Sequence, residues 1–173
     1  MSATLPICFN TSNFCIKFLG FIFAFGLLYF SSMSSDQTVT RLGYAGLSPF
    51  VLLTGLMWLV DSESLAFVSI ALTGYTAAIV SFLGGVHWGI GFMKGPAAPR
   101  YHFIWGIVPS LVAWLALMMP TYAALPLLGL MLLACYVFDS KTYPTAGLTR
   151  WLPMRLRLTV VAALSCLLGA AAV

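Results

Sequence analysis

The side chains that could carry chemistry in this sequence are few, and they interrupt an otherwise apolar chain. His87 lies inside a long apolar segment, Asp139 follows another, and Arg155 and Arg157 border the last one. An ionisable residue inside a membrane-spanning helix is a functional candidate, because moving its charge into hydrocarbon is costly. We therefore predict that His87, Arg100, Asp139, Arg155 and Arg157 form a site for an anionic headgroup or solute at one membrane face.

A simpler interpretation stays open for the same residues. A neutral His87 can hydrogen-bond a neighbouring helix, while Asp139 and the two arginines can anchor helix ends at the interface. Asp139 can pair with either Arg155 or Arg157. Because these arginines are two residues apart, they point about 160° away from each other on a helix. One of them is expected to face the bundle and the other the lipid headgroups.

His102 adds a second histidine at the same membrane face, which raises the question of a metal or haem. Metal sites need several His, Cys or carboxylate ligands at suitable spacing, and the sequence around the two histidines offers none. The four cysteines, at positions 8, 15, 135 and 166, form no Cys-x-x-Cys pair. The sequence also contains no His-Glu-x-x-His or Gly-x-Ser-x-Gly. We therefore predict no metal, no cofactor and no enzymatic activity.

Small residues recur at every fourth position of the segment that holds His87, so on a helix they form one stripe. In lipid, small residues let helix backbones approach closely, and Gly-x-x-x-Gly is a frequent form of this contact. We predict a packing face within the chain; the alternatives are a homodimer seam and a surface that a ligand approaches closely. The stripe consists of Thr73, Ala77, Ser81, Gly85 and Gly89.

The elements that must position these residues are apolar helices. The chain has 173 residues, of which 61% are hydrophobic and 7% charged, whereas a soluble domain has about 25% charged residues. Its mean hydropathy is +1.01, so its solvent must be lipid. Since a spanning helix needs about 20 apolar residues, we predict an all-α, polytopic transmembrane bundle with five core helices. The predicted helices cover residues 42–60, 65–93, 101–119, 123–138 and 156–173.

The positive charges fix an orientation for this bundle. If the chain crosses the membrane five times, all seven Lys and Arg of residues 41–157 fall on one side, and the other side receives Asp61 and Glu63. Lys and Arg in short loops stay on the cytoplasmic side. The start of the first core helix is therefore expected on the inner side and the C-terminus outside. The seven residues are Arg41, Lys94, Arg100, Lys141, Arg150, Arg155 and Arg157.

We divide the chain into an N-terminal extension, residues 1–40, and the five-helix domain, residues 41–173. The extension contains a 17-residue apolar stretch, residues 14–30, with Lys17 near its start. It is interpreted as an extra helix, a signal anchor, or the result of a start codon placed too early, with Met33 as the natural start. These alternatives leave open whether residues 1–32 belong to the native protein.

Four segments resemble motifs of the DUF3429 / transmembrane protein 69 family, in the same order and across about residues 41–160. They are Leu-Gly-Tyr-Ala-Gly-Leu-Ser-Pro-Phe at 42–50, Ser-Phe-Leu-Gly-Gly-Val-His-Trp-Gly at 81–89, Val-Pro-Ser-Leu-Val-Ala-Trp at 108–114 and Leu-Arg-Leu-Thr at 156–159. The resemblance implies a small multi-pass protein of a bacterial or mitochondrial inner membrane. It implies no reaction, and it singles out for testing Gly84, Gly85, His87, Trp88, Pro109 and Trp114.

Function is therefore a choice between two classes. We expect a non-enzymatic scaffold, assembly factor or lipid-interacting protein, because buried ionisable groups are scarce and the small-residue stripe suits contact between helices. The alternative is an oligomeric transporter or channel for a small solute or ion, in which His87 would lie on the pathway. The expected partners are membrane lipids and a second copy or another membrane protein. No nucleic-acid partner is expected, because the net charge of +4 comes mostly from loop residues.

Overall fold

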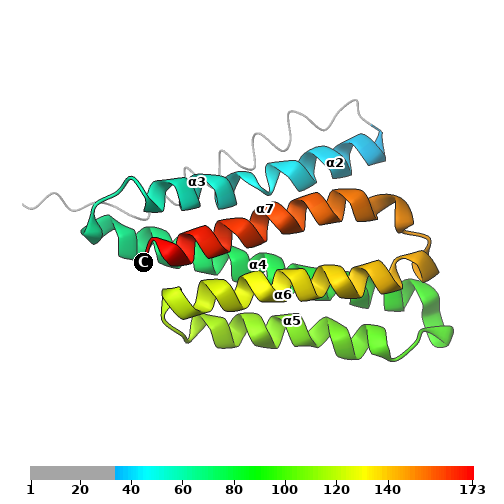
Figure 1. The fold of residues 1–173 in the computed structure, drawn as a ribbon. Coiled ribbons are helices and arrows are strands. Elements are labelled where there is room, and N and C mark those ends of the chain that lie inside the picture. The colour runs from blue at the N-terminus through cyan, green and yellow to red at the C-terminus, as the bar shows by residue number, and fades with distance from the viewer. Residues whose placement is uncertain (1–33) are drawn as a thin grey trace, which may run out of the picture. The chain divides into compact units, whose positions relative to one another are not determined.

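The computed structural model describes residues 34–173, and these residues form helices and their connections, without strands (Figure 1). The apolar stretch at 14–30 lies outside the described residues. Residues 42–173 form one compact unit, which contains the bundle described below. The predicted all-α bundle is confirmed. Its helices are α2 (Ser35–Ala45), α3 (Ser48–Met57), α4 (Ser62–Lys94), α5 (Tyr101–Leu117), α6 (Thr121–Thr142) and α7 (Leu152–Ala171).

The first predicted core helix, residues 42–60, is wrong as a continuous element. It is divided between α2 and α3 at Gly46 and Leu47. Pro49 explains the break, because proline has no N–H to donate to the carbonyl of Ala45 and its ring crowds that carbonyl. Two side chains satisfy the freed backbone oxygens: the Ser48 hydroxyl donates to Ala45 at 2.8 Å, and the Tyr75 hydroxyl of α4 donates to Gly46 at 2.8 Å.

Two helices extend further than the sequence predicted. Asp139 was assigned to the polar connection after residue 138, yet α6 continues through it to Thr142. The last helix is predicted to start at residue 156, just after Arg155, but α7 already begins at Leu152. Charged residues normally mark helix ends, and here the ion pair described below lets the carboxylate stay within the helix. The connection shrinks to two short 3-10 turns, Pro144–Ala146 and Thr149–Trp151.

Helix α4 is the central element of the bundle, since it contacts α3, α5, α6 and α7. The most extensive contacts join α4 to α5 and α6 to α7. Fully buried apolar side chains fill the space between these pairs, including Leu72 and Val80 of α4 and Leu125 and Leu128 of α6. This core holds the four long helices at fixed rotations about their axes, which is what brings distant polar residues together.

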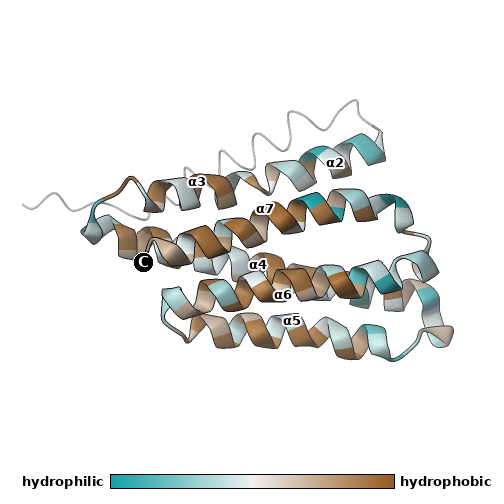
Figure 2. Cartoon of the chain, in the orientation of Figure 1, coloured by the Kyte–Doolittle hydropathy of each residue, from teal (hydrophilic) through white to brown (hydrophobic). Residues whose placement is uncertain are grey.

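Three helical stretches are long and apolar enough to cross a membrane: Ser62–Ala97, Thr121–Thr142 and Thr149–Ala171. Helix α5 is also apolar, although it has only 17 residues. Apolar residues recur along all of these helices (Figure 2). Large apolar side chains such as Phe67, Ile104 and Leu130 are each more than 60% exposed. A continuous surface of this kind is stable in hydrocarbon and not in water.

The cations of two connections gather at one end of the bundle. Figure 1 shows the α4–α5 and α6–α7 connections at one end. Lys94 and Arg100 flank the first connection and Lys141 and Arg150 the second, so these cations share that end. Asp61 and Glu63 lie at the start of α4, at the other end. The grouping of charges that the sequence suggested is therefore present in the folded bundle.

Candidate functional site

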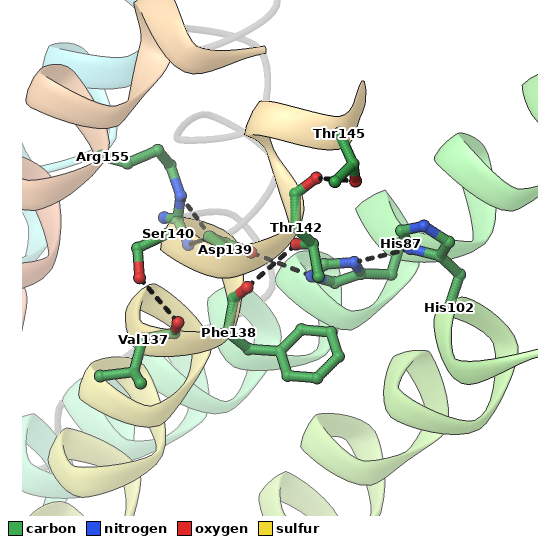
Figure 3. Close-up of polar contacts among 9 residues, drawn as sticks. All are labelled: His87, His102, Val137, Phe138, Asp139, Ser140, Thr142, Thr145 and Arg155. Atoms are coloured by element: carbon green, nitrogen blue, oxygen red, sulfur yellow. Dashed lines mark hydrogen bonds and ion pairs between the residues drawn. The ribbon is translucent and has the colours of Figure 1, made fainter. Parts of the chain in front are cut away.

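One cluster of polar side chains is buried inside the bundle near its basic end (Figure 3). It takes one residue from each of four helices: His87 from α4, His102 from α5, Asp139 from α6 and Arg155 from α7. The two histidines and Asp139 are at most 2% exposed, and the side chain of Arg155 is 12% exposed. Buried charges are tolerated when they are paired and hydrogen-bonded, so the contacts within this cluster decide what it can do.

Asp139 is the centre of the cluster, and its two oxygens serve different partners. Arg155 donates to Oδ2 from Nε at 2.9 Å and also from Nη2. His87 approaches the other oxygen, with Nε2 at 2.9 Å from Oδ1. Arginine is always charged in proteins, so its fork holds Asp139 as a carboxylate that can only accept hydrogen bonds. His87 must therefore carry its proton on Nε2 and donate it to Asp139.

The two histidines contact each other across the α4–α5 interface. Their Nδ1 atoms are 3.4 Å apart, and their rings stack at 25° with centroids 5.6 Å apart. A neutral His87 that donates from Nε2 has a lone pair on Nδ1, so His102 must donate from its own Nδ1. The Nε2 atom of His102 is buried and has no hydrogen-bond partner among residues 34–173.

Aromatic rings pack against the two histidines of the cluster. The ring of Phe138 meets His87 edge-on at 5.1 Å and stacks on Trp105 at 4.2 Å. The Tyr101 ring lies 4.4 Å from that of His102. Burial, followed by the negative charge of Asp139, raises the pKa of Tyr143 to about 12, so its phenol stays protonated beside the cluster.

Glycines set the distance between α4 and α5, and so make the histidine contact possible. A Cβ on Gly84 would overlap the carbonyl oxygen of Gly106 on the facing helix, and a Cβ on Gly91 would lie 2.7 Å from the Phe103 ring. A Cβ on Gly106 would overlap the indole of Trp88. The backbones therefore approach as closely as glycine permits.

The predicted packing stripe is only partly buried, and its glycines are not the ones in contact. Thr73 and Ala77 are buried, and Ser81 is half-buried. Gly85 and Gly89 are exposed, and a Cβ on either would meet no atom of the described chain within 4 Å. Within residues 34–173 these two glycines pack against no neighbouring helix, because α4 is rotated so that Gly84 and Gly91 face α5.

The exposed part of the stripe opens into a groove of about 270 Å³ on the outer surface between α4 and α5. Ser81, Gly85 and Trp88 form one wall, and Gly106, Ile107 and Ser110 the other. The Trp88 indole N–H donates to the carbonyl oxygen of Phe103 at 3.0 Å and so fixes the ring at this position. We call this surface, defined by these six lining residues, the α4–α5 groove.

The five residues predicted to bind an anion do not form one site. His87, Asp139 and Arg155 meet in the cluster, but Arg155 directs its charge to Asp139. Arg157 is exposed and contacts the hydroxyl of Tyr44 at 3.4 Å, while Arg100 is exposed just before α5. Of the two ion pairs that the sequence allowed, Asp139 forms the one with Arg155.

His102 is the residue that sequence reasoning missed as a partner of His87. The sequence placed both histidines near one membrane face but did not fix which side of α5 His102 occupies. Within residues 34–173, no group of three His, Cys, Asp or Glu side chains is arranged to hold a metal ion. The arrangement of the cluster instead suits holding or passing a proton, because it is a chain of hydrogen bonds between titratable groups.

The sequence is similar to one known protein family and to a relative within the membrane proteins. The model of the family described as "Protein of unknown function (DUF3429)" matches residues 35–171. A protein named "Transmembrane protein 69" from Xenopus tropicalis is 38% identical over 134 residues, which cover 72% of this chain and 50% of the relative. The chain thus spans about half the length of that relative. No solved structure matches it.

Proposed function

We propose that this chain, which belongs to the DUF3429 family, is a multi-pass, non-enzymatic scaffold of a bacterial or mitochondrial inner membrane. In this proposal the α4–α5 groove receives a transmembrane helix of a second copy of the chain. The observation that carries the proposal is the exposure of Gly85 and Gly89, which meet no atom of the described chain within 4 Å of a Cβ. The name of the Xenopus tropicalis relative supports a place in a membrane.

The chemistry of the groove suits a helix. Gly85 in the groove, and Gly89 one turn further along α4, leave the α4 backbone open to close approach, which is the main source of affinity between helices in lipid. Ser81 and Ser110 lie on opposite walls and offer hydroxyl groups for hydrogen bonds across helices. A second copy presents the same face, and a surface that pairs with itself gives a closed dimer.

The remaining outer surface of the bundle is apolar and is assigned to lipid. The cations at the α4–α5 and α6–α7 connections favour the cytoplasmic or matrix side for that end of the bundle. With this orientation the C-terminus lies on the opposite side. The lipids nearest these cations are expected to be anionic, since Lys and Arg at a membrane surface attract such headgroups.

Filling the groove tests the proposal. We expect Gly85→Ile to weaken self-association in lipid vesicles at least tenfold, because the new side chain occupies the place of the incoming helix. Förster transfer between labelled copies of the full chain measures the change. Gly55→Ile on α3 is the matched control, since Gly55 is also exposed with no atom near its Cβ. Equal self-association of the two variants would refute the dimer.

Ion transport is the competing function, and the buried His87–Asp139 contact is the observation in its favour. For a scaffold, we expect vesicles that contain the wild-type chain and vesicles that contain His87→Ala to show the same proton flux under a pH gradient. A pH-sensitive dye inside the vesicles measures it. Fast flux in the wild type that His87→Ala removes would replace the scaffold with a transporter.

A further inference from the structure

The hydrogen bonds of the buried cluster converge on the carboxylate of Asp139. Arg155 donates to Asp139, His87 donates to Asp139 from Nε2, and His102 donates to His87 from Nδ1. Each assignment follows from the one before it, starting from the permanent charge of arginine. The chain of donors ends at Nε2 of His102, which consequently bears a lone pair and no proton.

This last nitrogen is an unusual group to bury. His102 is 0% exposed, and its Nε2 has no hydrogen-bond partner within residues 34–173. A buried acceptor that forms no hydrogen bond destabilises the fold, whereas an imidazole lone pair can also be satisfied by binding a proton. We propose that His102 and His87 together form a binding site for one proton, which enters at Nε2 of His102.

The proton moves between the two rings in a balanced step. An N–H bond forms at Nε2 of His102, with hydronium from the aqueous side as the donor and water as the product. The N–H bond at Nδ1 of His102 then breaks as an N–H bond forms at Nδ1 of His87, 3.4 Å away. His102 ends neutral with its proton on Nε2, and the positive charge rests on His87, beside the carboxylate of Asp139.

The groups around the pair explain why the charge settles on His87. Among the described residues, Asp139 is the acid in contact with the pair, and it contacts His87. His102 instead experiences the positive charge of Lys94. The titratable or charged groups that surround the pair are Lys94 at the end of α4, Tyr101 on α5, Cys135 and Asp139 on α6, Tyr143 after α6, and Arg155 on α7.

Proton binding changes how the helices are connected. With His87 positively charged, Asp139 is shared by two cations, His87 of α4 and Arg155 of α7. The α4–α6 contact becomes a charged pair, and the contact of α6 with Arg155 weakens. This inference does not depend on the scaffold proposal, because it concerns the interior of one chain and not the α4–α5 groove.

Nitrogen NMR of the full chain in lipid bilayers tests the site directly. The chain contains two histidines, so ¹⁵N-histidine labelling gives two sets of signals, which one variant assigns. We expect at neutral pH a proton on Nδ1 of His102, the less common tautomer, and on Nε2 of His87. As the pH falls, His87 should become doubly protonated while His102 moves its proton to Nε2. A proton on Nε2 of His102 at neutral pH would overturn the proposal.

A pair of substitutions separates proton binding from a purely structural role. Asparagine places an amide N–H near the position of Nδ1, so His102→Asn keeps the donor to His87 and removes the Nε2 acceptor. We expect this variant to fold with the wild-type melting temperature within a few degrees and His87 to stay singly protonated across the pH range in which the wild type changes. Unchanged titration of His87 in His102→Asn would also overturn the proposal. His102→Gln, which lacks the donor near Nδ1, should lose both the histidine contact and the titration.

Discussion

Replacing Asp139 with alanine is expected to destabilise the folded chain more than any other single substitution in the buried cluster. The change leaves the guanidinium of Arg155 and the Nε2–H of His87 without their acceptor, in a site where Asp139 itself is 2% exposed. Removing one partner of a buried ion pair costs about 3–5 kcal/mol. Unfolding in mixed detergent micelles, followed by circular dichroism, measures the loss.

Two further variants show whether the loss comes from the unpaired charge. Asp61→Ala is the matched control, because Asp61 is exposed at the start of α4 and its side chain caps no helix N–H; about 0.5 kcal/mol or less is expected. The double variant Asp139→Ala with Arg155→Leu should recover part of the stability, since an apolar pair can replace a buried ion pair at little cost. If Asp139→Ala were as mild as Asp61→Ala, the buried pair would contribute nothing to the fold.

Alanine at two adjacent glycines of α4 is expected to have opposite effects. Gly84→Ala forces a methyl group onto the carbonyl oxygen of Gly106, and the rigid backbone cannot yield easily. Overpacking of this kind costs about 1–3 kcal/mol. Gly85→Ala meets no atom of the described chain within 4 Å and should stabilise the helix by up to about 1 kcal/mol, because alanine is the better helix former. Melting temperatures of the two variants in the same detergent provide the comparison.

Each of the two adjacent glycines is a control for the other, because the substitution changes helix propensity equally at both and both lie at the same depth in the membrane. They differ only in the side of α4 that they face. Gly106→Ala supplies a second test of the same contact, because its methyl group would overlap the indole of Trp88. It should also disturb the hydrogen bond from that indole to Phe103, which tryptophan fluorescence can follow. Equal stabilities of Gly84→Ala and Gly85→Ala would mean that α4 and α5 do not approach as closely as described.

The sequence by itself determined that the protein is surrounded by lipid, that it is helical, and that its loop cations lie at one end of the bundle. An apolar content of 61% with 7% charged residues leaves lipid as the only medium in which long apolar helices can expose their surface. A helical period of 100° per residue puts Leu83, Gly84 and Gly91 on the same side of the helix as His87, and all four are buried. These features are local, because each depends only on residues within one helix.

Only the tertiary structure decided which polar residues meet. Periodicity fixes angles within one helix but not the rotation of that helix against its neighbours, and that rotation follows from packing of the whole core. The rotation of the helices therefore pairs Asp139 with Arg155 and not with Arg157, and it brings His102 against His87. It also buries Gly84 and leaves Gly85 exposed. The break between α2 and α3 has a local cause in Pro49. The hydroxyl that satisfies the freed carbonyl of Gly46 belongs to Tyr75 of α4, which is 29 residues away along the chain.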